Sequence, residues 1–307
     1  MTSHHLCRDS LDGLSVGDAL GAQFFVPGNS FDDLLAGRPP AAPWPWTDDT
    51  EMACSVVAEL SAGGALDQDR LATAFAQRHE PYRGYGAGSI VLLRQLRDGA
   101  SWRKAAPAAF DGQGSMGNGA AMRVAPLGAF HATDPRTAAL EAMRSAEITH
   151  THPEAILGAV AVAVAAAHAG ATRLAGERPE PARLLDAVLD VLVESRVRAG
   201  VERARGMLGA SVAEVAYELG NGARVLAHDT VPFTLWAAAT YLHDYPAAIT
   251  ACVEAGGDVD TTAAIVGGIV AAFTGTGGNG VPHAWLTARE PLPHFALPEM
   301  SPGDVVL

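Results

Sequence analysis

The sequence predicts an all-α protein, and three observations support this prediction. Ala, Leu and Val recur at helical spacing along most of the chain, whereas few segments alternate polar and apolar residues as strands do. Asp67, Asp134 and Ser211 stand where helix N-caps are expected, directly before apolar periodic segments. The loops rich in Gly, Pro and polar residues are too short to separate independent domains, so we expect one compact domain over residues 1–307.

Each expected helix is a segment in which apolar residues return every three or four positions. In chain order these helices are Arg8–Gln23, Thr50–Ser61, Asp67–Gln77, Gly88–Arg97, Asn118–Phe130, Asp134–Ile148, Pro153–Ala169, Ala182–Ser195, Ser211–Tyr217, Val231–Leu242, Pro246–Glu254 and Asp260–Phe273. The expected loops are Pro27–Trp46, Pro81–Gly86, Asp111–Gly117, Ala175–Pro181 and Thr274–Pro282. The proline-rich stretch Glu290–Leu307 is expected to lie extended on the surface.

Composition and charge exclude several classes of protein. The chain is 49% hydrophobic and 18% charged, which is typical of a globular protein and not of a disordered one. Its formal net charge of −13 leaves no basic surface for a nucleic-acid backbone or an anionic membrane. We therefore expect neither nucleic acid nor membrane as a partner.

The cysteines, the N-terminal residues and the apolar runs favour a cytoplasmic protein. The three cysteines are far apart and form no CxxC pair, so we expect reduced thiols. The first residues lack the basic start and apolar stretch of a signal peptide. The most apolar runs, Ala155–Ala169 and Thr261–Phe273, are shorter than the roughly 20 residues that cross a membrane and are interpreted as buried helices.

Two acidic clusters stand at predicted loop-to-helix junctions, Trp46–Glu51 and Gly256–Thr262. Helix capping explains one or two of these side chains in each cluster, but it does not require adjacent carboxylates. Taken together, the clusters favour a metal site made of oxygen donors, which selects Mg²⁺ or Mn²⁺ over zinc. The expected donors are Thr47, Asp48, Asp49, Asp258, Asp260 and Thr261. Because four carboxylates are many for one Mg²⁺, we expect two ions.

Two glycine-rich loops lie between the acidic clusters. Gly112–Gly119 leads into a predicted helix, so its N–H groups either form a nest for phosphate or belong to an ordinary flexible turn. Its glycines match neither a P-loop nor a dinucleotide fingerprint. The second loop, Pro81–Ser89, carries tyrosines that either line a cleft or anchor the loop to the core, and the sequence leaves both open.

His150 and His152 precede a long apolar helix. The carboxylate-rich cluster is a hard ligand set that does not require imidazole, so metal binding by these histidines is not favoured. Either one histidine forms hydrogen bonds within the loop, or one contacts a substrate. A serine hydrolase is not expected, because the chain has no Gly-x-Ser-x-Gly elbow.

Five motifs in order resemble those of the ADP-ribosylglycohydrolase family. They are Gly17–Ala22, Thr47–Thr50, Gly117–Arg123, Thr149–Pro153 and Gly257–Thr261. The resemblance extends over about residues 8–275. One such motif carries little information, but five in the same order are specific.

The resemblance implies an orthogonally packed all-α bundle that holds two Mg²⁺ or Mn²⁺ ions at the base of a cleft. It also implies hydrolysis of the bond between the anomeric carbon of ADP-ribose and a protein side chain. The partner would then be an ADP-ribosylated protein or an ADP-ribose-containing small molecule. By position, the six oxygen donors named above correspond to the metal ligands of the family. Ser115, Met116, Gly117 and Asn118 correspond to the loop around the pyrophosphate and proximal ribose, and His150 to a histidine near that ribose.

Two departures from the family pattern bear on the mechanism. Phe25 stands where several relatives carry a glutamate that is a metal ligand or a base. Tyr85 is nearest to the position of an aspartate in other members, so we take it as a candidate contact with the substrate. Asp49 and Asp260 are therefore our candidates for orienting or deprotonating the attacking water. Arginine-linked ADP-ribose is the favoured substrate, because a guanidine leaving group depends less on a dedicated glutamate. The alternatives are a relative that only binds ADP-ribose and a hydrolase of another ribosylated small molecule.

Overall fold

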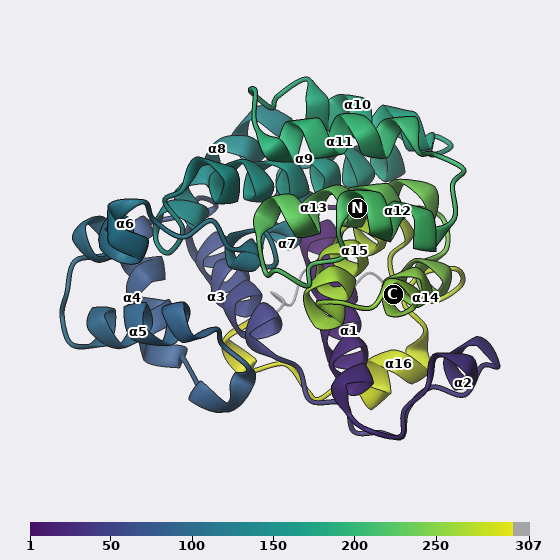
Figure 1. The fold of residues 1–307 in the computed structure, drawn as a ribbon, viewed down its shortest axis with the longest axis horizontal. Helices are drawn as coiled ribbons and strands as arrows, with labels where there is room; N and C mark the ends of the chain where they lie inside the picture. Colours follow the sequence, from purple (N-terminus) through teal and green to yellow (C-terminus); the bar gives the residue numbers. More distant parts are fainter. Residues whose placement is uncertain (297–307) are drawn as a thin grey trace.

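The computed structural model describes residues 1–296, and these residues form helices joined by short loops (Figure 1). Within this range the only β-type pairings are isolated bridges, so the all-α prediction is confirmed. The α-helices are α1 Ser3–Ala22, α2 Phe31–Leu35, α3 Asp48–Gly63, α4 Gln68–Arg78, α5 Ala87–Arg97, α6 Trp102–Gly112, α7 Ala125–Phe130, α8 Pro135–Glu147, α9 Pro153–Ala175, α10 Pro181–Leu189, α11 Arg196–Gly206, α12 Val212–Leu219, α13 Ala227–Thr240, α14 Tyr245–Ala255, α15 Val259–Thr274 and α16 His283–Ala288. Short 3-10 turns are η1 Gln23–Phe25, η2 Pro81–Arg83, η3 Asn118–Ala120 and η4 His294–Ala296.

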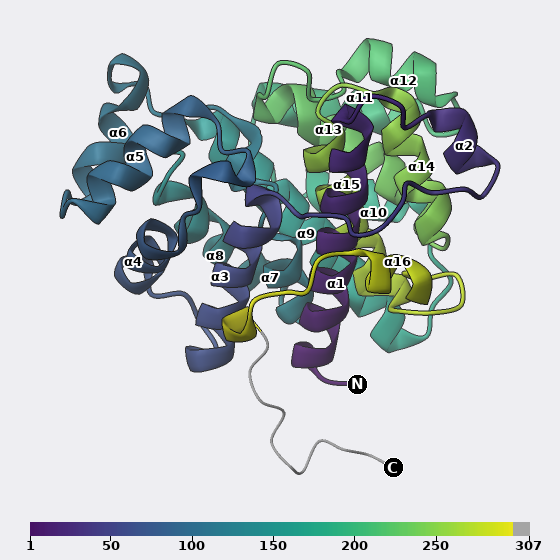
Figure 2. The same ribbon diagram turned by 90° about the horizontal axis from the view of Figure 1, so that it is seen from below.

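Helices α1 and α15 lie side by side at the centre of the molecule (Figures 1 and 2). Three glycines of α1, spaced four residues apart, face α15. A Cβ atom added at Gly17 would lie 2.1 Å from the carbonyl oxygen of Ala263, and one at Gly21 would lie 2.7 Å from that of Val259. Only glycine permits this approach of the two backbones, which brings the C-terminal end of α1 beside the first turn of α15.

The other helices surround this central pair. Helix α9 packs against α7, α8, α13 and α15, and α3 packs against α1. Helices α4, α5 and α6 form a separate group at one end of the molecule in both views (Figures 1 and 2). A gap between that group and the central helices contains the cavity described below.

Helix α9 confirms the prediction of a buried apolar helix but is longer than predicted. It continues past Ala169 to Ala175 and ends where Gly176 adopts a left-handed conformation, with φ of 65°. By length and composition it is apolar enough to cross a membrane, yet 78% of its most apolar window is buried inside the protein. That is the pattern of a core helix.

The predicted helix Asn118–Phe130 is wrong, because the structure divides it into η3 and α7. Pro126 has no N–H with which to continue a helix from the preceding turn, but it fits the first turn of a new one. Between the two elements, the side chain of Arg123 donates to the carbonyl oxygen of Gly119 at 3.1 Å.

Other differences concern one helix boundary and several helices that were not predicted. The segment predicted as one helix to Ser195 ends at Leu189, and Ser195 instead caps α11 by accepting from the N–H of Arg198. The buried face of α11 consists of small residues, and Gly200 lies against Pro232. The short helices α2, α6 and α16 were also not predicted. In α6 the backbone leaves helical geometry at Ala109–Asp111, just where the predicted loop begins.

The described part of the C-terminal stretch, predicted to lie extended on the surface, has no regular element over residues 290–293 and then forms η4. It is also anchored in the core, since Leu292 and Ala296 are buried in an apolar cluster with residues of α1 and α3. The N–H of Glu290 donates to the carbonyl oxygen of Trp44 at 2.8 Å. The remainder of the predicted stretch, 297–307, lies outside the described residues.

The close approach of α1 and α15 predicts a specific sensitivity to side-chain size. Gly17→Ala should lower the free energy of unfolding by about 1–3 kcal/mol or more, because the new methyl group meets backbone atoms that have no room to move. Gly206→Ala is the matched control, since nothing lies within 4 Å of its added Cβ atom. Urea unfolding of both variants measures the effect. Equal midpoints for Gly17→Ala and the unsubstituted protein would contradict the packing described here.

Candidate active site

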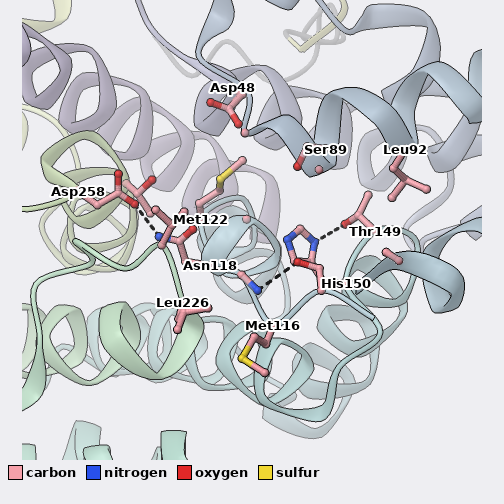
Figure 3. A pocket seen from close by; sticks show the side chains of 18 of the residues that line it. Asp48, Ser89, Leu92, Met116, Asn118, Met122, Thr149, His150, Leu226 and Asp258 are labelled. Carbon is pink, nitrogen blue, oxygen red and sulfur yellow. Dashed lines mark hydrogen bonds between the residues drawn. The ribbon is translucent and has the colours of Figure 1, made fainter. Parts of the chain in front are cut away.

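A cavity of about 630 Å³ lies between the α4–α6 group and the central helices (Figure 3). One end is lined by carboxylates from the first turns of α3 and α15 and from the residue before α15. The other end is lined by the glycine-rich loop that precedes η3, by His150 and by residues of α5 and α6. The sequence-predicted residues that line it are Asp48, Asp49, Ser115, Met116, Gly117, Asn118, His150, Asp258, Asp260 and Thr261.

Three carboxylates from three helices meet at the carboxylate end. Asp18 of α1, Asp49 of α3 and Asp260 of α15 each offer an oxygen, and these oxygens lie within 4.8 Å of one another. Asp48 and Asp258 line the same cavity beside them. The two acidic clusters, separated by about 200 positions in the sequence, therefore converge in space.

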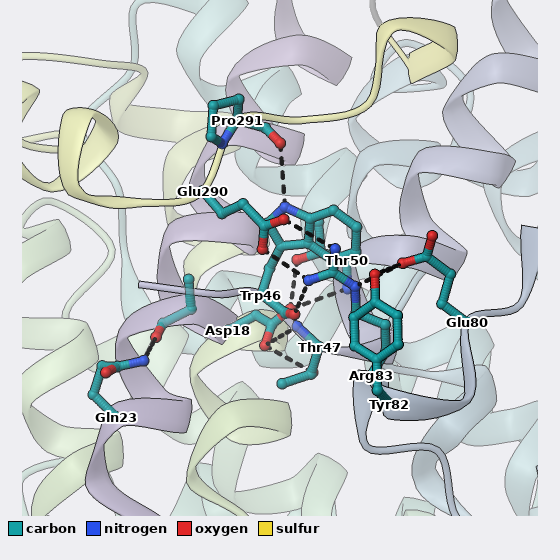
Figure 4. A network of polar contacts seen from close by, with 11 residues as sticks. Asp18, Gln23, Trp46, Thr47, Thr50, Glu80, Tyr82, Arg83, Glu290 and Pro291 are labelled. Carbon is teal, nitrogen blue, oxygen red and sulfur yellow. Dashed lines mark hydrogen bonds and ion pairs between the residues drawn. The ribbon is translucent and has the colours of Figure 1, made fainter. Parts of the chain in front are cut away.

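Asp18 was not predicted as a site residue, although it holds this end of the cavity together (Figure 4). Its carboxylate accepts from the N–H and hydroxyl of Thr47, at 2.9 and 2.8 Å, and from those of Thr50, at 3.1 and 2.5 Å. Thr47 is the N-cap residue of α3, but its own side chain does not cap the helix. Asp18 therefore supplies the cap of α3 from a different helix.

Burial and mutual repulsion raise the pKa of these carboxyl groups. Burial raises the pKa of Asp18 to about 6, although the hydrogen bonds from Thr50 and Thr47 lower it. Burial, followed by the charge of Asp18, raises the pKa of Asp48 to about 8. The pKa values of Asp49 and Asp260 lie well above the ordinary range, first because of burial and then because of neighbouring carboxylates. Such a group requires protons or a cation to balance its charge.

The donor set fits a hard divalent cation. Asp49 Oδ1 is buried and has no hydrogen-bond partner within residues 1–296. The hydroxyl of Thr47 lies 2.8 Å from Asp18 Oδ1 and 2.9 Å from Asp49 Oδ2, yet it has only one proton to donate. The atoms that converge are all oxygens, which Mg²⁺ and Mn²⁺ prefer. The roles of the six predicted donors as metal ligands stay a prediction.

Arg83 fixes the segment that leads into this cluster (Figure 4). Its guanidinium stacks on the ring of Trp46, 3.3 Å from the ring centroid, and donates to the carbonyl oxygen of Trp46 at 2.9 Å. It also forms two hydrogen bonds with the carboxylate of Glu290, at 2.8 and 3.0 Å. Arg83 thus fixes both the ring and the backbone of Trp46, the residue directly before Thr47.

The glycine-rich loop is tightly packed rather than open. The N–H of Gly117 donates to Ser115 Oγ at 3.2 Å, and that of Asn118 donates to the carbonyl oxygen of Val225 at 3.1 Å. Two of the N–H groups expected to form an anion nest are therefore already hydrogen-bonded. The amide of Asn118 donates to Asp258 Oδ2 at 2.7 Å, so this side chain connects the loop to the carboxylate end (Figure 3).

The glycines of this loop make room for the segment that contains the two histidines. A Cβ atom at Gly119 would lie 3.1 Å from His150 Nε2, and one at Gly114 would lie 2.1 Å from Thr151 Oγ1. His152 accepts from the N–H of Glu154 and caps α9, whereas His150 lines the cavity. Burial and then the charge of Arg123 lower the pKa of His150 to about 3, so its ring is neutral.

Three residues singled out in the sequence, Thr47, Tyr85 and Phe25, do not line the cavity as described over residues 1–296. Tyr85 is buried behind it and donates its hydroxyl proton to Glu51 Oε2 at 2.5 Å. The tyrosine thus anchors its loop to the core, and its predicted contact with substrate has no support in the geometry. Phe25 follows α1 in η1 and is 55% exposed. It brings no carboxylate to the site.

Several cavity residues carry no signal in the sequence. Phe110 and Val225 are exposed apolar residues of the cavity wall, and both adopt positive φ angles, of 53° and 58°. Such angles are rare outside glycine and occur often at functional sites. Asp18 carried one signal that was missed, because it is the one charged residue in the apolar segment Gly13–Ala22.

Comparisons with known proteins agree with this geometry. The sequence profile described as ADP-ribosylglycohydrolase matches residues 3–299. Human "ADP-ribosylhydrolase ARH3" is 32% identical over 275 residues, which cover 80% of this chain and 74% of that protein. "ADP-ribosylarginine hydrolase Tri1" of Pseudomonas putida is 28% identical over 162 residues, which cover 48% of this chain and 42% of that protein.

A solved structure described as "ADP-ribosylglycohydrolase-related protein complex" has a similar fold. It superposes with a TM-score of 0.66 at 25% sequence identity, and the match covers 96% of this chain and 95% of that chain. The family resemblance of the five sequence motifs is thereby confirmed over nearly the whole chain. The chain belongs to the ADP-ribosylglycohydrolase family and is a glycohydrolase.

Proposed function

We propose that this glycohydrolase uses divalent cations to cleave the glycosidic bond between ADP-ribose and a protein side chain, with arginine as the favoured linkage. One observation supports this most directly. The carboxylates of Asp18, Asp49 and Asp260 converge at one end of a cavity whose other end contains His150 and the glycine-rich loop. The cavity suits a large ribosylated substrate, because its charged end can hold the reacting sugar and its other end can hold the rest of the ligand.

The carboxylate end has the donors that such cations need. Among the described residues, Asp49 has a buried oxygen that lacks a hydrogen-bond partner, and Asp48 and Asp258 add further oxygens beside it. When bound there, Mg²⁺ or Mn²⁺ supplies Lewis acidity that orients hydroxyl groups and lowers the pKa of water. Four or five carboxylates favour two ions over one.

The side chains of this protein supply the remaining functions. Cleavage at an anomeric carbon passes through an oxocarbenium-like state, which carboxylates stabilise by their negative charge. Asp49 and Asp260 are our candidates for orienting the water and accepting its proton, since Phe25 replaces the family glutamate. Asn118 holds Asp258 in place by donating to its carboxylate at 2.7 Å.

Arginine is the favoured linkage because a guanidine leaving group depends less on a dedicated glutamate. The name of the Pseudomonas putida relative supports this choice over about half of the chain. The presence of Phe25 also supports a second candidate, a relative that binds ADP-ribose without cleaving its linkage to protein.

The decisive experiment measures release of free ADP-ribose from three modified proteins. One carries ADP-ribose on arginine, the second on serine, and the third on aspartate or glutamate. Each substrate is incubated with Mg²⁺, with Mn²⁺ and with EDTA. We expect metal-dependent release from the arginine-linked substrate. Release from another linkage would correct the leaving group. Metal-dependent binding of ADP-ribose without release from any substrate would favour the binding-only candidate.

Substitution of the proposed water-orienting carboxylates should separate activity from stability. Asp49→Asn and Asp260→Asn should each lower kcat by about 10²- to 10⁴-fold. Neither should lower the stability of the metal-free protein, because each replaces a carboxyl group whose charged form is disfavoured there with a neutral amide. Asp98→Asn, at the exposed end of α5, is the control and should change neither kcat nor the free energy of unfolding. Kinetics and urea unfolding on the same preparations provide the readout. Full activity of both site variants would refute this mechanism.

The raised pKa values predict a characteristic pH dependence of stability. Between the ordinary aspartate pKa of 3.8 and the values of about 6 for Asp18 and about 8 for Asp48, the folded chain binds more protons than the unfolded chain. The free energy of unfolding of the metal-free protein should therefore fall as pH rises through this interval.

A bound cation should restore the free energy of unfolding that is lost at high pH, because it balances the carboxylate charge. At a concentration 100 times its Kd, Mn²⁺ should raise the free energy of unfolding by about 2.7 kcal/mol at pH 8. Urea titrations with Mn²⁺ and with EDTA measure the difference. Identical unfolding curves under both conditions would mean that the carboxylate cluster does not bind the ion.

A further inference from the structure

Arg123 is a fully buried arginine in the segment between η3 and α7. Among the ion pairs formed by residues 1–296, none involves its guanidinium. The group instead donates to the carbonyl oxygens of Ser145, at 2.6 Å, and Gly119, at 3.1 Å, and to Thr149 Oγ1 at 3.0 Å. A buried charge without a counter-ion is costly, so this arginine calls for an explanation beyond packing.

The contact with Thr149 determines the direction of the next hydrogen bond. A guanidinium only donates, so Thr149 Oγ1 must accept from Arg123. The hydroxyl of Thr149 then has one proton left to donate, and its other partner is His150 Nδ1 at 2.7 Å (Figure 3). If His150 Nδ1 also carried a proton, that hydroxyl proton would have no acceptor among the described contacts. His150 Nδ1 is therefore the acceptor.

The second nitrogen of the His150 ring must then carry the proton. Nε2 takes part in no hydrogen bond within the described residues and lies against the glycine-rich loop at the cavity wall. A Cβ atom would lie 3.3 Å from Nε2 at Gly117 and 3.1 Å from it at Gly119, so the glycines leave this nitrogen accessible. The outcome is a neutral imidazole with its N–H at the cavity wall.

We propose that Arg123 and Thr149 are positioning residues that hold His150 as the neutral Nε2–H tautomer, which gives the cavity a fixed hydrogen-bond donor. The acceptor is an oxygen of the ligand, and its assignment to ADP-ribose rests on the function proposed above. The opposite tautomer would present a lone pair at Nε2, which would repel a hydroxyl or phosphate oxygen that offers no proton. Arg123 reaches the ring of His150 through the hydroxyl of Thr149.

The direct test is the tautomer of His150 in the full-length protein without ligand. Histidine labelled with ¹⁵N is observed by two-bond ¹H–¹⁵N spectroscopy, and the His150 signals are those lost in His150→Ala. We expect an unprotonated Nδ1 and a protonated Nε2 in the unsubstituted protein. A protonated Nδ1 would overturn the proposal, and this result depends on no variant and on no substrate.

Two substitutions at Thr149 test the relay itself. Thr149→Val removes the hydroxyl at nearly constant volume, and Thr149→Ser keeps it. In Thr149→Val the two tautomers should mix and the Kd for ADP-ribose, measured by calorimetry, should rise about five- to tenfold, which is the usual effect of one hydrogen bond. Thr149→Ser should retain the tautomer and bind within about twofold of the unsubstituted protein.

The outcomes separate this inference from the proposed function. If Thr149→Val and Thr149→Ser give the same His150 spectrum, the relay is refuted, whatever the activity. If Thr149→Val does not fold, the spectra of the unsubstituted protein and Thr149→Ser still decide the tautomer. If the unsubstituted protein shows the Nε2–H tautomer but does not bind ADP-ribose, the relay stands and the ligand assignment fails.

Discussion

The contact between the backbones of α1 and α15 determines where every part of the carboxylate cluster lies. Because Gly13, Gly17 and Gly21 carry no Cβ atom, α1 approaches α15 until Asp18 stands beside Asp260. Asp18 in turn accepts four hydrogen bonds from the start of α3 and so places Asp49 in the same group. The absence of side chains at three glycines thus allows Asp18, Asp49 and Asp260, which are far apart in the sequence, to lie together.

Much of this arrangement was predictable from the sequence, and the exceptions have physical reasons. Helical periodicity and adjacent carboxylates are local patterns, so the all-α class and the two acidic clusters were evident. Asp18 was not, because its role is to cap a helix that begins 30 positions later, and no local pattern records that contact. Tyr85 is the opposite case, since its position relative to the family made it a candidate substrate contact while the structure directs its hydroxyl to Glu51. The break of the predicted helix has a local cause in the sequence, because Pro126 cannot continue a helix from the preceding turn.

The glycine-rich loop shows why glycines alone identify a function poorly. A phosphate nest and a close approach of two chain segments both require residues without side chains. In this structure Gly114, Gly117 and Gly119 face the Thr149–Thr151 segment, and they allow the ring of His150 to reach the cavity wall. The same loop carries Asn118, whose amide reaches Asp258. The loop therefore joins the two ends of the cavity. An anion site alone would not require this connection.

Val225 shows how the cavity wall and the carboxylate end are mechanically connected. A β-branched residue at a φ of 58° costs about 1–3 kcal/mol, and the surrounding structure must supply that energy. In this conformation its carbonyl oxygen accepts the N–H of Asn118 at 3.1 Å, while the side chain of Asn118 holds Asp258. Relaxation of Val225 to ordinary geometry would displace that oxygen and, through Asn118, a carboxylate. The strained backbone of Val225 at the cavity wall is thus joined through two hydrogen bonds of Asn118 to a carboxylate at the other end.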